Sequence, residues 1–361
     1  NRTTGVLYVL DEPSIGLHPA NIEGLAGVMD DLVSDGNSVV LVDHDTQILA
    51  KSDWIIEMGP GAGQDGGRVI ASGTPGELGD NPLSQIGPFL SGKTGVQKRP
   101  RTAAQELFAL GTIHLSTGPI HTVKPLETDI PKGRLTAVTG VSGSGKTTLI
   151  LESLIPGLEA FIRGNRLPDH VRSLQASGIR QVKLIDASPI GINIRSTVAT
   201  YANVHDELRK IFARTEDAKG ANCKAGDFSY NTGKLRCPVC DGTGVISLDV
   251  QFLPDVQIPC PECRGSRYSR DAEKIRYRTG DGRSFSLPQL MDMDVTRALD
   301  ACRELKNVRQ RLQILQDLGL GYLTLGEETP SLSGGEAQRL KLASEMGKSQ
   351  SDSLFVFDEP T

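Results

Sequence analysis

The stretch Gly140-Val-Ser-Gly-Ser-Gly-Lys-Thr147 is the feature of this sequence that most restricts its fold. It fits G-x-x-x-x-G-K-[ST] in full, and it follows an apolar stretch, Leu135–Thr139, that is typical of a strand. Glycines let successive backbone N–H groups wrap an anion, and the start of a following helix adds partial positive charge. We predict a nucleotide-binding loop in which Lys146 reaches the terminal phosphates and Thr147 ligates magnesium. The predicted binding residues are Gly140, Ser142, Gly143, Ser144, Gly145, Lys146, Thr147 and Thr148.

Two apolar strands in this sequence end in the same acidic phrase, Asp-Glu-Pro. The first leads into Asp11 and Glu12, and the second leads into Asp358 and Glu359. In nucleoside triphosphatases an aspartate at such a strand end holds magnesium, and a neighbouring polar residue orients the attacking water. We therefore predict that Asp358 and Glu359 complete the nucleotide site of the phosphate loop upstream of them.

Between the phosphate loop and the second acidic phrase lies Leu-Ser-Gly-Gly-Glu at 332–336. Such residues place the free N–H groups of a helix start against an anion. The phrase matches the signature sequence of the ATP-binding-cassette family, in which the signature of one cassette closes over nucleotide held by another. His44, at the end of the apolar strand Ser38–Val42, resembles the histidine of that family that contacts the γ-phosphate. The signature residues assigned by this resemblance are Ser333, Gly334 and Gly335.

This resemblance implies two cassettes in one polypeptide. Residues 1–90 correspond to the C-terminal part of the first cassette, and 110–361 to most of the second. The first acidic phrase, His44 and the signature would then serve one nucleotide, whose phosphate loop is not in this sequence. We therefore expect the chain to be part of a longer one, and to hydrolyse ATP weakly or not at all by itself.

Strands alternating with helices favour an α/β fold, here a P-loop ATPase cassette with a mixed sheet and flanking helices. Within the second cassette, residues 160–310 are interpreted as an insertion whose zinc module spans about 223–283. A polar, basic segment at 91–109 is typical of a linker. The remaining predicted elements are strands at Val6–Leu10 and Leu354–Phe357 and helices at Ala20–Ser34 and 296–317.

Four of the six cysteines fall in two repeats of Cys-Pro-x-Cys-x-Gly, with the overall spacing C-x2-C-x19-C-x2-C. This spacing is typical of a tetrahedral zinc site, and each glycine permits a tight turn after its cysteine pair. Disulfides or free thiols are the alternative, which so low a cysteine content disfavours. The predicted ligands of a structural Zn²⁺ are Cys237, Cys240, Cys260 and Cys263.

A zinc ribbon inside a cassette restricts the resemblance to one family within the ATP-binding-cassette class. The phrases FLPDVQIPCPECRGSRY (252–268) and SPIGINIRSTVATY (188–201) resemble the UvrA family of the ABC excinuclease, the damage-recognition ATPases of bacterial nucleotide excision repair. The resemblance runs through nearly the whole chain. It implies a cytoplasmic, dimeric ATPase that uses ATP, Mg²⁺ and Zn²⁺. It also implies two partners, damaged double-stranded DNA and UvrB, the helicase-like component of the excinuclease.

One position departs from this family. The residue before SPIG is typically a glutamine that touches magnesium and the attacking water, whereas here it is Ala187. The departure leaves two alternatives open: a UvrA-like antibiotic-resistance branch and a nucleotide-gated binding module without hydrolysis. The cassette motifs alone leave a third open, an ATPase of this class that does not act on DNA, such as a transporter ATPase.

DNA contacts are predicted in residues 264–283, where seven Arg or Lys stand against three Asp or Glu. A basic patch suits phosphate contacts, which position a protein on DNA without specifying sequence. Recognition of a lesion fits this mode, because a damaged duplex differs in deformability. A solvated charged surface is the alternative. The candidate residues in this patch are Arg264, Arg267 and Arg270, and Arg195, in NIRSTVATY, is a separate candidate.

The overall composition gives no sign of nucleic-acid binding by itself. The net charge is −5, so any DNA-binding surface must be local. No apolar run approaches the roughly 20 residues of a membrane-spanning helix, which argues against a membrane-embedded transporter. Paired cysteines with metal spacing indicate a reducing compartment.

Overall fold

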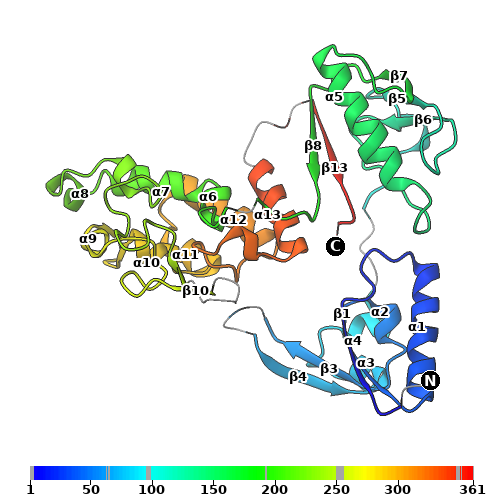
Figure 1. Cartoon of the computed structure of the whole chain (residues 1–361), viewed down its shortest axis with the longest axis horizontal. Helices are drawn as coiled ribbons and strands as arrows, with labels where there is room; N and C mark the ends of the chain where they lie inside the picture. The colour runs from blue at the N-terminus through cyan, green and yellow to red at the C-terminus, as the bar shows by residue number, and fades with distance from the viewer. Residues whose placement is uncertain are drawn as a thin grey trace. The chain divides into compact units, whose positions relative to one another are not determined.

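The computed structural model describes residues 4–360 except 62, 64–65, 95–98, 192, 249–255, 347–349 and 351. Residues 95–98 of the predicted linker therefore lie outside the described residues. The chain forms two compact units, one of residues 1–183 with 352–356 and one of residues 184–351 with 357–361. Two paired strands, β8 (Gln181–Ile185) and β13 (Ser353–Phe357), run from one unit into the other (Figure 1).

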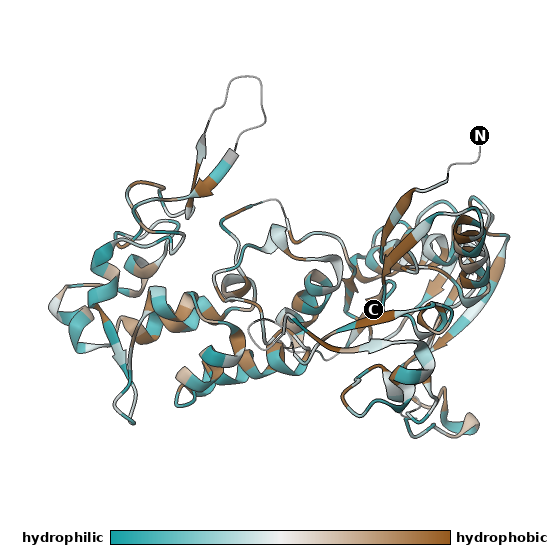
Figure 2. Ribbon diagram, turned by 90° about the horizontal axis from the view of Figure 1, so that it is seen from below, coloured by the Kyte–Doolittle hydropathy of each residue, from teal (hydrophilic) through white to brown (hydrophobic). Residues whose placement is uncertain are grey.

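The first unit begins with a parallel pair of strands covered by a helix. Strands β1 (Leu7–Asp11) and β2 (Ser38–Val42) pair in parallel, so both carboxyl ends meet at one edge. Helix α1 (Pro19–Ser34) packs on one face, with Ile22 and Ala26 buried. Brown, hydrophobic stretches mark strands of this unit in Figure 2. The predicted elements at Val6–Leu10, Ala20–Ser34 and Ser38–Val42 are confirmed within one residue at each end.

Several short elements follow this pair and form a small separate core. Strands β3 and β4 are antiparallel, and Ile55, Ala71 and Leu78 are buried between them and the helices beside them. The elements are α2 (Thr46–Leu49), β3 (Ile55–Gly59), β4 (Arg68–Gly73), α3 (Pro75–Asp80) and α4 (Gly87–Leu90).

The phosphate loop lies in a second core of the first unit. Strand β5 (Thr112–Thr117) is the centre of an antiparallel three-stranded sheet, between β6 (Leu126–Pro131) and β7 (Val171–Gln175). A π-helical segment, Thr148–Leu154, follows the loop and continues as α5 (Ile155–Arg163). Leu154 and Leu158, of the π-helical segment and α5, pack against buried residues of β5 and β7.

The expected strand at Leu135–Thr139, directly before the phosphate loop, is not formed. Residues 135–139 have no strand structure, and Leu135 is 79% exposed. A strand needs a hydrogen-bonded neighbour, and among the described residues no strand pairs with this stretch. The predicted strand at Leu135–Thr139 was wrong because apolar composition does not reveal whether a neighbouring strand is present.

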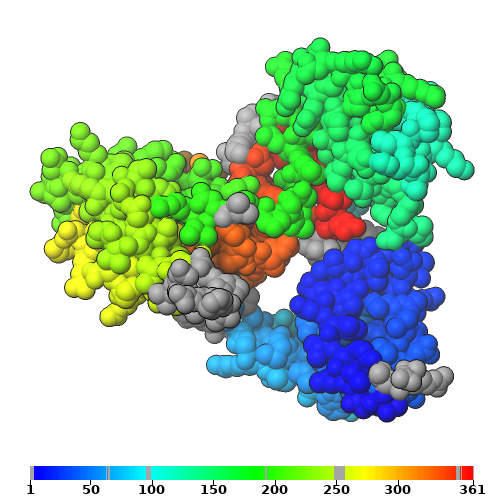
Figure 3. All heavy atoms as spheres, in the orientation of Figure 1, coloured from blue at the N-terminus to red at the C-terminus, as the bar shows by residue number. Residues whose placement is uncertain are grey.

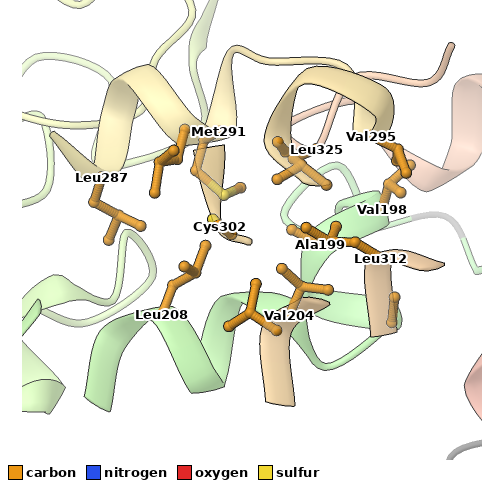
Figure 4. Close-up of a cluster of buried hydrophobic side chains, with 14 of the residues drawn as sticks. Val198, Ala199, Val204, Leu208, Leu287, Met291, Val295, Cys302, Leu312 and Leu325 are labelled. Atoms are coloured by element: carbon orange, nitrogen blue, oxygen red, sulfur yellow. The ribbon is translucent and has the colours of Figure 1, made fainter. Parts of the chain in front are cut away.

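The second unit is mainly helical and has one continuous hydrophobic core. Apolar side chains from α6, α7, α10, α11 and α12 meet in it (Figure 4). In Figure 3 the yellow-green, yellow and orange atoms of this unit pack closely together. Its elements are α6 (Val198–Tyr201), α7 (Val204–Phe212), α8 (Glu216–Gly220), β9 (Val245–Leu248), β10 (Val256–Pro259), α9 (Arg270–Lys274), β11 (Arg276–Arg278), β12 (Ser284–Ser286), α10 (Leu287–Met291), α11 (Val295–Ala301), α12 (Lys306–Asp317) and α13 (Gly334–Met346).

The single helix expected at 296–317 is divided into α11 and α12. The chain turns between them, where the Leu305 N–H donates to the carbonyl oxygen of Cys302 at 2.9 Å. Arg303, in this turn, pairs with Asp281, with 2.7 Å between nitrogen and oxygen. This tertiary ion pair joins residues far apart in sequence, so helical periodicity alone does not reveal the break.

A buried histidine makes the stability of this unit depend on pH. His205 is 3% exposed, and its Nε2 lies 2.7 Å from the hydroxyl of Tyr268. Burial, assisted by nearby Arg209 and opposed by Asp206, lowers the pKa of His205 to about 3. The folded protein therefore keeps this ring neutral, whereas the unfolded chain binds a proton below about pH 6.5.

We predict that stability present above about pH 6.5 is lost as pH falls toward 3, by roughly 2 kcal/mol at pH 5. Urea unfolding at several pH values measures this loss. His205→Gln, which keeps a polar group near Tyr268 but does not titrate, should flatten the dependence. An unchanged slope in that variant would show that other groups cause it.

Candidate nucleotide and zinc sites

The phosphate loop has the backbone conformation that its glycines predict. Gly143 and Gly145 have φ of +76° and +93°, a region that favours glycine. A Cβ on Gly145 would lie 2.5 Å from Cγ2 of Val123, so the close approach of a neighbouring turn also requires glycine. The ammonium of Lys146 donates to the carbonyl oxygen of Gly140 at 2.8 Å and to that of the next residue at 3.1 Å.

The helix start after this loop carries a small chain of polar side chains. Thr147 is exposed, and the hydroxyl of Thr148 donates to Glu152 at 3.1 Å. The other carboxylate oxygen of Glu152 lies 3.0 Å from Nε2 of His121. Neither His121 nor Glu152 was predicted from the sequence, because no spacing pattern connects them to the loop.

The structure brings together the three residues predicted for the first cassette. Because β1 and β2 are parallel, the acidic phrase after β1 lies beside His44 after β2. Nδ1 of His44 is 3.9 Å from a carboxylate oxygen of Glu12, and both side chains are about half exposed or more. The Glu12 N–H donates to the carbonyl oxygen of Val42 at 2.7 Å. Asp11, the last residue of β1, is at the same edge.

Asp43 holds this edge together, although the sequence motifs assigned it no role. It accepts hydrogen bonds from the N–H and hydroxyl of Ser14 at 3.1 and 2.7 Å. It also accepts from the N–H groups of His44 and Asp45 at 2.7 and 2.9 Å. Partial burial acts in the opposite direction, but these hydrogen bonds lower the pKa of Asp43. An aspartate directly after an apolar strand was the available signal.

The second acidic phrase repeats the local geometry of the first. Glu359 has φ of +44°, and Glu12 has φ of +45°, an uncommon conformation for a residue with a Cβ. The Asp358 N–H donates to the carbonyl oxygen of Ile185, the last residue of β8, at 3.2 Å. The phosphate loop and this phrase belong to different units, so their joint site stays a prediction.

The signature phrase begins helix α13 with a reciprocal cap. The Ser333 N–H donates to a carboxylate oxygen of Glu336 at 2.7 Å, and the Glu336 N–H reaches the Ser333 hydroxyl at 3.4 Å. Tyr322 donates to the other oxygen of the same carboxylate at 2.5 Å. This capping box fixes the helix start where Gly334 and Gly335 lie.

Helix α13 is also tied to the end of β8, where the unusual alanine lies. Lys341 forms an ion pair with Asp186 and donates to the carbonyl oxygen of Ser188 at 2.8 Å. Burial opposes the effect, but bonds from Lys341 and Ser188 lower the pKa of Asp186. A Cβ on Gly334 would lie 3.2 Å from the Cβ of Ala187, so the signature glycine packs directly against that alanine.

The amide of Gln338 makes a further link from α13. It donates to the carbonyl oxygens of Ile185 at 3.0 Å and Asp358 at 2.8 Å. The signature helix is therefore bonded to both strand ends beside it, through groups that a signature motif alone does not reveal.

The four predicted metal ligands come together. All four Sγ atoms lie within 4.8 Å of one another. The Cys237–Cys260 and Cys240–Cys263 sulfur pairs are 3.9 and 3.6 Å apart. Tetrahedral zinc with Zn–S bonds of about 2.3 Å would separate its sulfurs by about 3.8 Å. The donor set and its spacing therefore fit Zn²⁺.

The two knuckles, residues 237–244 and 260–267, are related by reciprocal backbone bonds. The Cys237 N–H donates to the carbonyl oxygen of Arg267, and the Cys260 N–H donates to that of Gly244, both at 2.9 Å. Gly242 has φ of +79°, and a Cβ there would overlap the carbonyl oxygen of Tyr230. The pairing of β9 with β10 joins the knuckles at their other side.

The predicted DNA contacts differ in exposure. Arg264 is exposed, Arg270 is exposed and paired with Glu262 at 3.0 Å, and Arg195 is 29% exposed. Arg267 must be withdrawn as a DNA contact, because its side chain is 4% exposed and pairs with Glu328 at 2.8 Å.

Much of the charge in residues 264–283 is also neutralised by acidic residues nearby. Arg278 pairs with Asp217, Arg283 with Asp281 and Asp300, and Lys274 with Asp271. Outside acids such as Asp217 and Asp300 were not included in the sequence count, so the basic patch is weaker than predicted.

The curated proteins and the solved structure that this chain resembles carry related names. No family model matches the chain. It is 40% identical to UvrABC system protein A of Lactococcus lactis over 364 residues, covering all of this chain and 38% of that protein. The Bacillus subtilis protein of the same name is 40% identical, with 37% of its length covered. The crystal structure of UvrA2 from Deinococcus radiodurans matches with a TM-score of 0.86 and 37% identity, over all of this chain and 42% of that one.

Proposed function

We propose a function from this premise: the chain belongs to the family of UvrABC system protein A, and it spans less than two fifths of the length of the curated relatives described above. The proposed function is that of a part of a DNA-damage-recognition ATPase in nucleotide excision repair. The observation that carries it is similarity along the whole chain to these proteins, together with a clustered four-cysteine site and a complete phosphate loop.

In this proposal ATP and Mg²⁺ bind at composite sites between cassettes. Lys146 and the loop N–H groups would hold phosphates, Thr147 and Asp358 would supply oxygen ligands for Mg²⁺, and Glu359 would orient the attacking water. Asp11, Glu12 and His44 do the same for a second nucleotide, which the signature at 332–336 would cover. Support comes from the paired geometry of the two acidic phrases and the capped signature helix.

The domain division belongs to the same proposal. Residues 1–90 form the end of a first cassette, 91–109 a linker, and 110–361 most of a second cassette with its insertion at 160–310. Zn²⁺ at the four cysteines is structural, since it supplies folding free energy to knuckles that have little apolar core of their own.

The proposal also includes DNA binding, a homodimer and a cytoplasmic location. Exposed Arg264 and Arg270, together with Arg195, would contact phosphates of damaged double-stranded DNA. The helicase-like excinuclease component UvrB is the proposed protein partner, as the name of the relatives suggests. Among the described residues no helix is long and apolar enough to cross a bilayer.

A nucleotide-gated binding module without hydrolysis is the second candidate. The observation that favours it is Ala187, whose methyl group packs against Gly334 and has no polar atom to hold water or magnesium. A UvrA-like resistance factor would be one form of such a module.

Titration of the zinc-loaded chain against a fluorescent duplex tests the repair proposal. Anisotropy is read with ATP at two salt concentrations, for a duplex with one bulky adduct and for the same duplex without it. We expect salt-sensitive binding that is tighter for the adduct. Salt-sensitive binding that is equal for the two duplexes would favour a module that contacts only the DNA backbone. No binding at low salt would contradict a DNA role for this part.

A further inference from the structure

The second knuckle carries an arginine where the first carries a glycine. Gly244 and Arg267 each stand seven residues after the first cysteine of their repeat. Their φ values are +81° and +71°, a conformation that suits glycine and is unfavourable for a residue with a Cβ. The first knuckle has glycine at the equivalent position. Backbone strain at an arginine there therefore indicates that the contacts of its side chain matter.

The guanidinium of Arg267 joins the knuckle to the segment that leads into the signature helix. It is buried and lies 2.8 Å from a carboxylate oxygen of Glu328. It also donates to the carbonyl oxygen of Gly242 at 3.5 Å, and its central carbon is 5.3 Å from the centroid of the buried ring of Tyr230. A charge-assisted bond in such surroundings is strong and directional.

Glu328 stands five residues before Ser333, which caps the signature helix. It leads into a 3₁₀ turn, Thr329–Ser331, and its carbonyl oxygen accepts from the Ser331 hydroxyl at 2.7 Å. The Thr329 N–H donates to the carbonyl oxygen of Ser196 at 3.0 Å. Movement of Glu328 would therefore move the residues that begin α13.

A second link joins the other knuckle to the same segment. Arg195 donates to the carbonyl oxygen of Asp241 at 2.9 Å and lies 3.4 Å from its carboxylate. The carbonyl oxygen of Arg195 accepts from the hydroxyl of Tyr230 at 3.0 Å. Because Ser196 follows Arg195 and contacts Thr329, both knuckles hold the segment before the signature.

The geometry assigns Arg267 and Glu328 the role of positioning residues that couple the zinc-binding knuckles to the start of the signature helix. The four cysteines would fix the knuckles by holding zinc, Arg267 transmits the position of the knuckles to Glu328, and Glu328 orders the residues that cap α13. An effect of this coupling on nucleotide binding rests on the proposed function, in which the signature contacts nucleotide.

Hydrogen–deuterium exchange of the zinc-loaded chain, without nucleotide, tests this coupling. Arg267→Gly gives the second knuckle the residue of the first, relieves the backbone strain and removes the guanidinium. We expect zinc content to stay at the wild-type level. Exchange at 328–340 should become about tenfold faster or more, as for loss of a buried charge-assisted bond. Exchange of α12 at 306–317 should not change.

Arg264→Gly is the matched control. It removes an exposed guanidinium, also at positive φ, from the same knuckle, and no ion pair of Arg264 occurs among the described residues. This variant should exchange like wild type. Glu328→Gln provides a second route to the same loosening of 328–340 if Arg267→Gly is unstable.

Chelation completes the test. Removing zinc from wild type should speed exchange at 328–340, whereas in Arg267→Gly it should add little there. Equal exchange in Arg267→Gly and Arg264→Gly would overturn the coupling, and so would faster exchange throughout the second unit in both Arg267→Gly and Glu328→Gln. Because nucleotide is absent from this experiment, its failure would leave the proposed ATP binding untouched.

Discussion

Gly242→Ala is expected to destabilise the second unit by about 2–5 kcal/mol. Alanine at φ of +79° carries a strain of about 1–2 kcal/mol. Its Cβ would also overlap the backbone carbonyl oxygen of Tyr230, which cannot turn away as a flexible side chain would. Relief requires the knuckle backbone to shift, at a further cost of about 1–3 kcal/mol. Urea unfolding of the zinc-loaded protein measures the total.

Gly265→Ala separates the two contributions. Gly265 holds the equivalent place in the second knuckle, has φ of +92°, and has open space where a Cβ would stand. This variant should lose only the strain, about 1–2 kcal/mol. If both variants lost the same stability, the backbone at Tyr230 would be able to move away from the added Cβ without cost.

Cys260→Ser is expected to abolish stoichiometric zinc binding and to unfold the knuckles. Structural zinc contributes roughly 10–16 kcal/mol to small zinc-dependent peptides. The cysteine cluster is separate from the main hydrophobic core, so few apolar contacts would replace the metal. Zinc analysis after dialysis and limited proteolysis of residues 236–268 measure both effects.

Cys223→Ser is the matched control for this loss. Cys223 is also buried, but it is not one of the four clustered cysteines. It should keep its zinc and resist proteolysis like wild type. Retention of zinc by Cys260→Ser, or equal loss in both variants, would contradict a four-thiolate site.

Local patterns predicted local structure well in this chain. Apolar runs placed β1 and β2, and a helix-like stretch placed α1, within one residue of their true ends, because these patterns are local to each element. The cysteine spacing likewise predicted which sulfurs meet, since ligand geometry is determined within each knuckle.

Features that depend on distant partners were missed. Arg267 was interpreted as a DNA contact because its neighbours are basic, yet its partner Glu328 lies 61 residues further along the chain. The stretch Leu135–Thr139 has strand composition but no paired neighbour among the described residues. Lys341 and Gln338 follow a familiar motif, and only the fold shows that they bond to the strand ends beside α13.

The most direct test of the proposed function is equilibrium binding of a fluorescent ATP analogue with Mg²⁺ to this chain and to its Lys146→Ala variant. Lys146 extends along a loop whose glycines have the conformation needed to cradle phosphates. We predict saturable binding by wild type, weakened at least about a hundredfold in Lys146→Ala, as for loss of charge-assisted bonds to phosphate. Lys132→Ala, in the same unit but outside the loop, should bind like wild type. Equal affinity in wild type and Lys146→Ala, or no binding by either, would contradict nucleotide binding at this loop.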